Sequence, residues 1–453
     1  MAAGSLTTEA STADNQTGSG TRKRLLTAPV WLPDPPRTLD EIDISESLIL
    51  DLAVRHVSVR GTCSIGKLAQ LMKLPLEFTE GVFRRLNDQQ YFEVRRMAGD
   101  DYIFSLSPSG KRLAAERAQS SRYAGPAPVS LKSWTAAVRA QLPHLDITQE
   151  KLQRAVSDIV VEPELLDALG PALISQGAIF LYGPSGTGKT TVAERLMRVF
   201  EDTITVPWAV EVDGQVILLA DPAVHQRVHP ADIEGSEDFT RSGINKLDID
   251  PRWIMCRRPF VAVGGELVTS MLDLQKDELS GAFSAPLQMK ANNGMLLIDD
   301  FGRQMISPRD LLNRWIVPLD RRVDFLSLGS GAKFDIPFEL QVLFSTNLAP
   351  HELADEAFLR RIPNKILLDA ATPRQFDEIF RLNAAALDME YEPGAAALLR
   401  QECLKHSPDL RPCYPRDICN AIRAITLYEG RRLFIGAAEI ERAVHGYFLQ
   451  TGA

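Results

Sequence analysis

The residues best suited to chemistry in this chain lie in the stretch GPSGTGKT, from Gly183 to Thr190. Its three glycines allow the backbone to curl so that successive N–H groups point inward at an anion. Lys189 can reach the outer phosphates of a nucleotide, and the Thr190 hydroxyl suits Mg²⁺. The pattern predicts a loop that binds nucleotide phosphates through Gly183, Pro184, Ser185, Gly186, Thr187, Gly188, Lys189, Thr190 and Thr191.

A pair of acidic residues further along the chain supplies a partner for that loop. In GMLLIDDFGR, an apolar run ends in Asp299 and Asp300. We expect Asp299 to organise Mg²⁺ together with Thr190, and Asp300 to be the base that polarises an attacking water. Two adjacent acids that close an apolar strand could instead form a plain solvated loop.

The segments around the loop have the periodicity needed to position it. AIFLY, from Ala178 to Tyr182, is typical of a buried parallel strand, and TTVAERLMRVF predicts a helix. The N-terminus of that helix would direct its dipole at the phosphates. Strand, glycine-rich loop and helix in this order favour a nucleotide site over a chance glycine-rich turn. The expected fold class is α/β, with a P-loop NTPase core built on a parallel sheet.

Further segments resemble those of the AAA+ ATPases, and the resemblance covers about residues 150–450. QVLFSTN (341–347) is similar to the sensor-1 strand, which implies that Asn347 lies between the acidic motif and the γ-phosphate. YPRDI (414–418) is similar to sensor 2 and implies a role for Arg416. SDIVVEPELL (157–166) resembles the segment that lines the adenine pocket, which implies contacts from Ile159 and Val160.

The same resemblance implies an arginine that acts on the neighbouring subunit. DEAFLRRIPNKI (355–366) matches that segment, so Arg361, or its neighbour Arg360, would reach the γ-phosphate of the adjacent chain. A guanidinium there would neutralise charge that develops in phosphoryl transfer. An arginine pair at a helix end can equally be a solvated cap.

Within AAA+, the segment RRVDFLSLGSGAKFDIPFE predicts a hairpin turned by Gly-Ser-Gly just before the sensor-1 strand. It is similar to the presensor-1 insertion of MoxR-type ATPases and enhancer-binding activators. One departure is Asp300, where the family usually has Glu, which leaves slow hydrolysis or a nucleotide switch open.

A second departure is the spacing of 110 positions between Lys189 and Asp299, more than a compact core needs. The excess contains a predicted hairpin turn at Asp213-Gly214. It also holds His225 and His229, for which we expect an idle loop rather than a metal site. FVAVGG (260–265) predicts a buried strand and turn rather than an aromatic pore loop.

The remaining chain divides by composition. Residues 1–36, rich in Ser, Thr, Gly and Pro, predict a disordered tail, although Trp31 and Leu32 could dock onto the body. Residues 37–121 read as helices followed by a hairpin and resemble a winged-helix domain. We expect a linker at 122–145, the ATPase core at 146–368, and a helical lid at 369–453 with helices near 373–388, 394–405, 415–428 and 437–449.

The winged-helix segment could contact either DNA or protein. Arg84 and Arg85 on its third helix and Arg95 and Arg96 on its hairpin could contact a duplex. The segment from Asp40 to Arg122, however, contains 12 basic and 12 acidic residues, so it lacks the net positive charge that duplex binders usually have. In the alternative reading these arginines form a solvated face, with Phe78, Val82 and Leu86 packed inward.

Bulk composition restricts the partners and the compartment. The 453 residues carry a formal net charge of -9, which does not attract nucleic acid or an anionic membrane over the whole surface. Five cysteines without CxxC spacing favour buried or idle thiols in a reducing compartment. No run of 18 apolar residues appears, so we expect a cytoplasmic protein without membrane insertion.

Together these features predict an ATPase that binds and hydrolyses Mg-ATP at subunit interfaces and remodels a protein partner. The resemblance implies a ring or helical homo-oligomer, most simply a hexamer. The alternative is a DNA-binding regulator whose assembly ATP switches, with slow hydrolysis.

Overall fold

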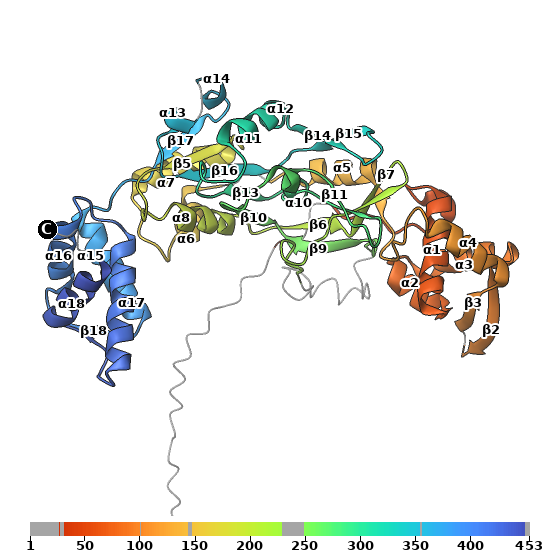
Figure 1. Cartoon of the computed structure of the whole chain (residues 1–453), viewed down its shortest axis with the longest axis horizontal. Helices are drawn as coiled ribbons and strands as arrows, with labels where there is room; N and C mark the ends of the chain where they lie inside the picture. The colour runs from red at the N-terminus through yellow and green to blue at the C-terminus, as the bar shows by residue number, and fades with distance from the viewer. Residues whose placement is uncertain are drawn as a thin grey trace, which may run out of the picture.

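The structure is a computed structural model that describes residues 27, 31–99, 101–143, 147–228, 249–353 and 356–448. Figure 1 shows an elongated arrangement, in which an N-terminal module and a C-terminal helical bundle lie at opposite ends of a central body. The expected residues His229 and Asp355 lie outside the described residues.

The central body is built on a five-stranded parallel sheet in the order β10-β13-β16-β5-β17. Its strands are β5 (Ile179–Tyr182), β10 (Phe260–Val263), β13 (Met295–Ile298), β16 (Gln341–Thr346) and β17 (Asn364–Leu367). The expected strands at AIFLY, FVAVGG, the acidic motif and QVLFSTN are all members of this sheet. The core is therefore a parallel α/β fold, as predicted.

Helices cover both faces of this sheet, because its strands are apolar on both sides. In β5, Phe180 faces one buried cluster, whereas Ile179 and Leu181 face the other. The first cluster packs against α11 (Pro308–Arg314) and α12 (Ile316–Arg321); the second packs against α6 (Gln149–Ala155), α7 (Pro163–Ile174) and α8 (Lys189–Leu196). Such continuous apolar strands are what a doubly covered parallel sheet requires. The shorter helices of the body are η2 (Met197–Val199), η4 (Thr269–Leu272), α10 (Leu287–Lys290), α13 (Pro350–Leu353) and α14 (Glu356–Leu359).

The extra length between Lys189 and Asp299 supplies four strands of a second, mixed sheet, whose order is β11-β12-β8-β7-β4; the fifth strand, β4, precedes the glycine-rich loop. Its strands are β4 (Val129–Ser130), β7 (Ala209–Val212), β8 (Gln215–Leu218), β11 (Gln275–Lys276) and β12 (Phe283–Ser284). The antiparallel pair β6 (Thr203–Pro207) and β9 (Trp253–Arg257) lies beside it. The predicted turn between β7 and β8 is present, with positive φ at Asp213 (48°) and Gly214 (75°).

The predicted hairpin before β16 is also present. It pairs β14 (Val323–Ser327) with β15 (Lys333–Pro337), and its buried side chains join the cluster beneath the second sheet. Asp324 is fully buried in this hairpin, where it pairs with Arg314 and accepts a hydrogen bond from Gln288 at 2.9 Å. The hairpin is therefore held firmly against the body at its base.

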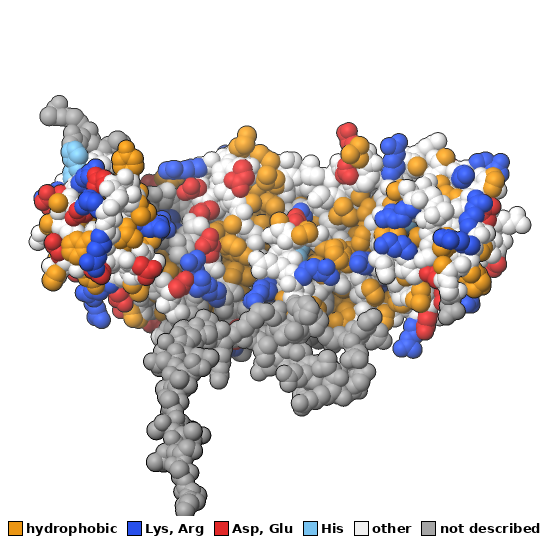
Figure 2. Space-filling model, turned by 90° about the horizontal axis from the view of Figure 1, so that it is seen from below, with side chains coloured by type: hydrophobic (Ala, Val, Ile, Leu, Met, Phe, Trp, Pro, Cys, Tyr) orange, Lys and Arg blue, Asp and Glu red, His pale blue; other side chains and the backbone are white. Residues whose placement is uncertain are grey.

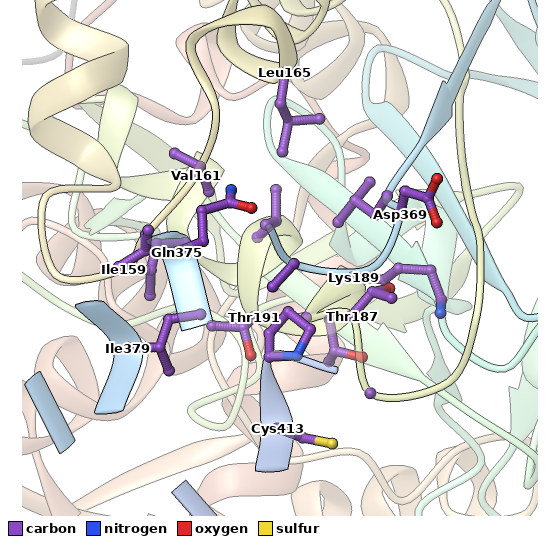
Figure 3. A pocket seen from close by; sticks show the side chains of 18 of the residues that line it. Ile159, Val161, Leu165, Thr187, Lys189, Thr191, Asp369, Gln375, Ile379 and Cys413 are labelled. Carbon is purple, nitrogen blue, oxygen red and sulfur yellow. The ribbon is translucent and has the colours of Figure 1, made fainter. Parts of the chain in front are cut away.

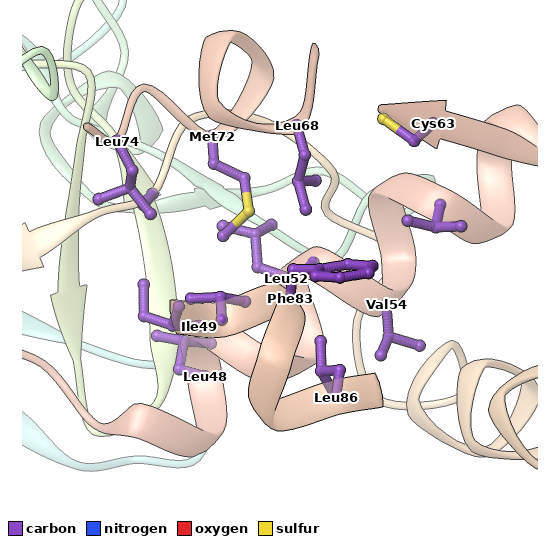
Figure 4. Close-up of a cluster of buried hydrophobic side chains, with 14 of the residues drawn as sticks. Leu48, Ile49, Leu52, Val54, Cys63, Leu68, Met72, Leu74, Phe83 and Leu86 are labelled. Carbon is purple, nitrogen blue, oxygen red and sulfur yellow. The ribbon is translucent and has the colours of Figure 1, made fainter. Parts of the chain in front are cut away.

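The N-terminal module comprises η1 (Leu39–Glu41), α1 (Glu46–Arg60), β1 (Thr62–Ser64), α2 (Ile65–Met72), α3 (Leu76–Asp88), β2 (Phe92–Ala98), β3 (Asp101–Leu106) and α4 (Pro108–Arg117). Its three strands form an antiparallel sheet in the order β1-β3-β2. Phe78, Val82 and Leu86 of α3 are buried, as in the alternative reading in which the arginines form a solvated face. Figure 4 shows the apolar side chains of α1, α2 and α3 meeting in one cluster.

The expected linker at 122–145 is wrong, because most of this segment is packed. Tyr123 and Ala127 join the apolar cluster of the N-terminal module, and the same cluster includes Ala209 and Val216 of the second sheet. The segment continues as β4 and α5 (Leu131–Ala140), whose Trp134 is 2% exposed. The prolines and glycine near residue 125 mark a bend in a packed chain, and the module is joined to the body by a continuous core.

The expectation of a disordered tail is wrong for residues 31–36, which pack against the body. Trp31 packs edge to face against Trp253, with ring centroids 4.8 Å apart, and the Pro33 carbonyl accepts a hydrogen bond from Asp250 N–H at 3.0 Å. Residues 1–26 and 28–30 lie outside the described residues. Apolar area on Trp31 thus offsets the entropy of ordering the segment from 31 to 36.

The C-terminal bundle consists of α15 (Pro373–Ala386), α16 (Ala395–His406), α17 (Cys413–Tyr428) and α18 (Ala437–Tyr447), with the short strands β18 (Glu390–Tyr391) and β19 (Phe434–Ile435). All four helices lie where the sequence predicted them. Thr372 and Gln375 form a reciprocal capping box that starts α15.

The expectation of an idle loop at His225 is wrong. This residue is 2% exposed, and its ring bonds the N–H of Asp221 and the carbonyl of Lys290. All five cysteines are described, and each is a free thiol. Over the described ranges, none of the helices combines the length and apolarity needed to cross a bilayer.

Candidate functional site

The glycine-rich loop connects β5 to α8 and has the backbone geometry that its glycines allow. Gly183, Gly186 and Gly188 have φ values of 141°, 82° and 91°, in the region that favours glycine. A Cβ on Gly183 would lie 2.1 Å from the carbonyl oxygen of Leu368, so only glycine fits there. Gly188 is the N-cap of α8, which directs the N-terminus of that helix at the inside of the loop.

Lys189 is buried within the loop and joins it to a distant strand. Its ammonium donates hydrogen bonds to the carbonyl oxygens of Gly183 (2.9 Å) and Pro184 (2.8 Å) and to Asn347 Oδ1 (2.8 Å). Burial lowers the pKa of Lys189, against the opposing charges of Asp299 and Asp300. The strand order explains the contact with Asn347, because β16 lies directly beside β5 and both end at the same edge.

Asp299 follows β13 and lies beside the start of α8. Its Oδ2 accepts a hydrogen bond from the Thr190 hydroxyl at 2.6 Å, and its backbone N–H donates to the Val263 carbonyl at 2.8 Å. A hydroxyl and a carboxylate side by side are hard oxygen ligands, so the donor set fits Mg²⁺. The next residue, Asp300, is exposed and has a positive φ of 48°; it lines the cavity into which the loop opens.

The loop forms one end of a cavity of about 950 Å³ between the central body and the C-terminal bundle. Figure 3 shows Ile159, Val161 and Leu165 in this cavity together with Thr187, Lys189 and Thr191. Val160 lines it as well. The cavity thus has a polar end at the loop and an apolar end at residues 159–165, in agreement with the size and character of a nucleoside triphosphate.

The C-terminal bundle contacts the loop directly. The N–H of Cys413 donates to the Gly186 carbonyl at 3.1 Å, and a Cβ on Gly186 would lie 2.5 Å from Cys413 Sγ. Arg416, one turn along α17, also lines the cavity; it is 61% exposed and pairs with Asp417 at 3.3 Å. Arg416 is therefore placed near the loop, with its guanidinium still largely accessible.

The structure does not bring Arg360 and Arg361 into the cavity of their own chain. Arg361 pairs with Asp320 at 2.8 Å, and Arg360 is exposed at the end of α14. The other predicted site residues, from Ile159 to Arg416, line the cavity, with the exception of Gly183 and Pro184. The carbonyl oxygens of these two residues accept hydrogen bonds from Lys189, which does line the cavity.

Sequence reasoning missed the side chains that the C-terminal bundle adds to the cavity. Gln375, Ile379 and Asn383 lie on one face of α15 at intervals of four residues and line its apolar end. That spacing was a signal available in the sequence. In the described ranges, no group of three or more His, Cys, Asp or Glu residues could hold a metal ion by protein ligands alone.

Comparisons with known proteins give one family match, which covers the C-terminal bundle, and weak likenesses to solved structures. A family described as a domain of unknown function (DUF8689) matches residues 372–446, and no curated protein matches the chain. Among solved structures, NtrX from Brucella abortus is similar with a TM-score of 0.40 at 14% identity, covering 72% of this chain and 70% of that one. The RuvB Holliday junction branch migration motor of Thermotoga maritima has a TM-score of 0.35 at 15% identity, covering 66% and 70%. Likenesses this weak carry no argument, so the fold assignment rests on the strand order and the loop geometry.

Proposed function

We propose that this chain is an AAA+ ATPase of the presensor-1 branch, which hydrolyses ATP at the cavity between the central body and the C-terminal bundle. The observation that carries the proposal is the joining of three distant segments at one edge of the sheet. Lys189 contacts Asn347, and Thr190 contacts Asp299, across 158 and 109 positions of sequence. A solvated glycine-rich turn has no reason to gather an ammonium, an amide, a hydroxyl and a carboxylate in this way.

In the proposed reaction, backbone N–H groups of the loop and Lys189 bind the phosphates, and Asn347 orients the group to be transferred. Thr190 and Asp299 would hold Mg²⁺, which supplies positive charge against the phosphate oxygens when bound. Asp300 would take the proton of the attacking water. Arg416 would add positive charge from the C-terminal bundle, which acts as a lid. The proposed reaction uses ATP as substrate and Mg²⁺ as cofactor.

We further propose that the active form is a homo-oligomer, a ring or a helix, in which Arg361 or Arg360 comes from the neighbouring chain. Both arginines lie outside the cavity of their own chain, which supports an action in trans. The presensor-1 assignment is supported by the hairpin β14–β15, which directly precedes β16.

The partner is proposed to be a protein that docks on the N-terminal module, which we interpret as a winged helix. Three of the four arginines that could contact a duplex are paired with acids: Arg84 with Glu80, Arg85 with Glu46, and Arg95 with Glu93. Figure 2 shows Asp and Glu side chains among the Lys and Arg side chains at this end of the molecule. Such pairing lowers the attraction for phosphate, so it favours protein remodelling over the DNA-bound regulator.

Mixing two inactive variants tests the subunit interface. Arg361→Ala should reduce phosphate release by about 10³-fold or more, as removal of an arginine finger does. Asp299→Ala should be inactive for a different reason, because it lacks the Mg²⁺ ligand. Mixtures should recover part of the activity, since some interfaces then combine an intact Asp299 with an intact arginine of the neighbour.

Arg360→Ala is tested in the same way and decides which arginine acts. Arg309→Ala, which removes an exposed arginine elsewhere on the body, is the matched control and should keep full activity. If both arginine variants keep wild-type activity, or if no mixture shows any recovery, the action in trans is wrong.

A further inference from the structure

Gln375 lies at the apolar end of the cavity and carries a polar group that the proposed chemistry does not use. It stands at the third position of α15, and Figure 3 shows its side chain near Val161 and Ile159. Lys189, at the phosphate end, lies on the other side of the same cavity. A nucleotide whose phosphates occupy the loop can therefore reach Gln375 with its base.

The orientation of the Gln375 amide is fixed by the capping box. Its Oε1 accepts hydrogen bonds from the backbone N–H of Thr372 (2.7 Å) and from the Thr372 hydroxyl (3.0 Å). A backbone N–H can only donate, so the atom that faces Thr372 must be the oxygen. The Nε2 group is thereby turned away from the cap, and within the part of the chain that the structure describes it makes no hydrogen bond.

The side chains that line the cavity around this donor are apolar. Ile159, Val161, Leu165 and Ile379 line the cavity around it. An N–H donor among apolar side chains recognises a ligand by pairing with an acceptor, because a ligand without one would leave the donor unpaired on binding. Purine rings present such acceptors as unprotonated ring nitrogens.

We infer that Gln375 is a base-binding residue, whose Nε2 donates a hydrogen bond to a ring nitrogen of the adenine base. This inference rests on the proposed function, since it requires ATP in the cavity. The same side chain then has two tasks: its oxygen starts α15 and its nitrogen contacts the base. Binding of the base is thereby coupled to the first turn of the bundle that contacts Gly186.

The test is Gln375→Glu, which separates the two tasks. Glutamate at this position completes a capping box as well as glutamine does, and its charge suits a helix N-terminus, so folding is preserved. The donor, however, is replaced by an acceptor. We expect the dissociation constant for ATP, measured by calorimetry on the full chain, to rise about 10-fold.

Three analogues identify the atom that is contacted: 1-deaza-ATP, 3-deaza-ATP and 7-deaza-ATP each lack one ring nitrogen. Wild-type protein should bind one of the three about 10-fold more weakly than ATP. That difference should vanish in Gln375→Glu. If the variant should be unstable, the wild-type series can still overturn the inference, because a contacted nitrogen must show as one weak analogue.

Gln401→Glu makes the same chemical change on the exposed face of α16 and is the matched control; it should bind ATP as wild type does. The inference is overturned if wild-type protein binds all three analogues as tightly as ATP, or if the analogue difference persists in Gln375→Glu. Failure of wild-type protein to bind ATP at all would instead overturn the proposed function, and this inference with it.

Discussion

Replacement of Lys189 by alanine is expected to weaken ATP binding by about 10²-fold or more and to abolish phosphate release. The reason is the position of Lys189, which is 7% exposed and whose ammonium donates to a loop carbonyl and to Asn347. Removal of a buried, hydrogen-bonded charge costs about 2–5 kcal/mol in a complex. Among the described residues, Lys365 is the one other lysine that lines the cavity, and its ammonium donates to the carbonyl oxygens of Leu359 and Ile362 instead.

The measurement is calorimetry with ATP and Mg²⁺, followed by an assay of phosphate release. Lys333→Ala, which removes an exposed lysine from β15, is the control and should behave as wild type. Because Lys189 also joins the loop to β16, thermal unfolding of the variant has to be compared with that of wild type. ATP turnover in a folded Lys189→Ala protein would refute the assigned site.

The second large effect is expected from Arg252, which holds the N-terminal module to the central body. Its guanidinium donates to Asp43 Oδ1 (2.8 Å) of the module, to the Pro128 carbonyl (3.1 Å) and to Asp250 Oδ2 (2.9 Å, from Nε). Arg252 is 5% exposed and Asp250 is 1% exposed. Arg252→Ala leaves two carboxylates without their cation and should lower the free energy of unfolding by about 3–5 kcal/mol.

This prediction is checked by urea unfolding, followed by tryptophan fluorescence. Arg252→Lys keeps the charge but cannot form the forked contacts, so an intermediate loss is expected. The control is Arg84→Ala, which removes an exposed ion pair with Glu80 and should change the stability by less than about 0.5 kcal/mol. Equal unfolding of Arg252→Ala and the control would show that the contact does not hold the module.

The same contact has a consequence for acid stability. Burial alone would raise the pKa of Asp43, but the charge of Arg252 and hydrogen bonds from Ser130, Ser133 and Arg252 hold it below its ordinary value of 3.8. A carboxyl group with a lowered folded pKa stabilises the protein above its unfolded pKa. This stabilisation is lost as the pH falls from about 4 through the lowered pKa of Asp43. The free energy of unfolding of Arg252→Ala should therefore decrease less over this pH range than that of wild type.

The sequence predicted the contiguous parts of the site better than the distant ones. The loop from Gly183 to Thr190 and the acids at 299 and 300 could be assigned because each follows a short apolar strand. The contact between Lys189 and Asn347 depends on the strand order, which no local pattern contains. Asn347 could be placed only through the resemblance of its segment to a known motif.

Two of the errors share a physical cause: the segment has a loop-like composition but also carries apolar residues that pack against the body. Residues 122–145 begin with prolines and a glycine, yet Trp134, Ala137 and Val138 follow at helical spacing and are buried. In the same way Trp31 docks a segment that its neighbours mark as disordered. Gln375 was missed because its role in the cavity comes from the packing of the bundle against the body.

The central claim is tested most directly by phosphate release from purified full-length chain in the presence of ATP and Mg²⁺, measured over a range of protein concentrations. We predict release that requires Mg²⁺ and whose rate per chain rises with concentration, as an arginine from the neighbouring chain requires. A rate equal to that of buffer at every concentration would contradict ATP hydrolysis by this site.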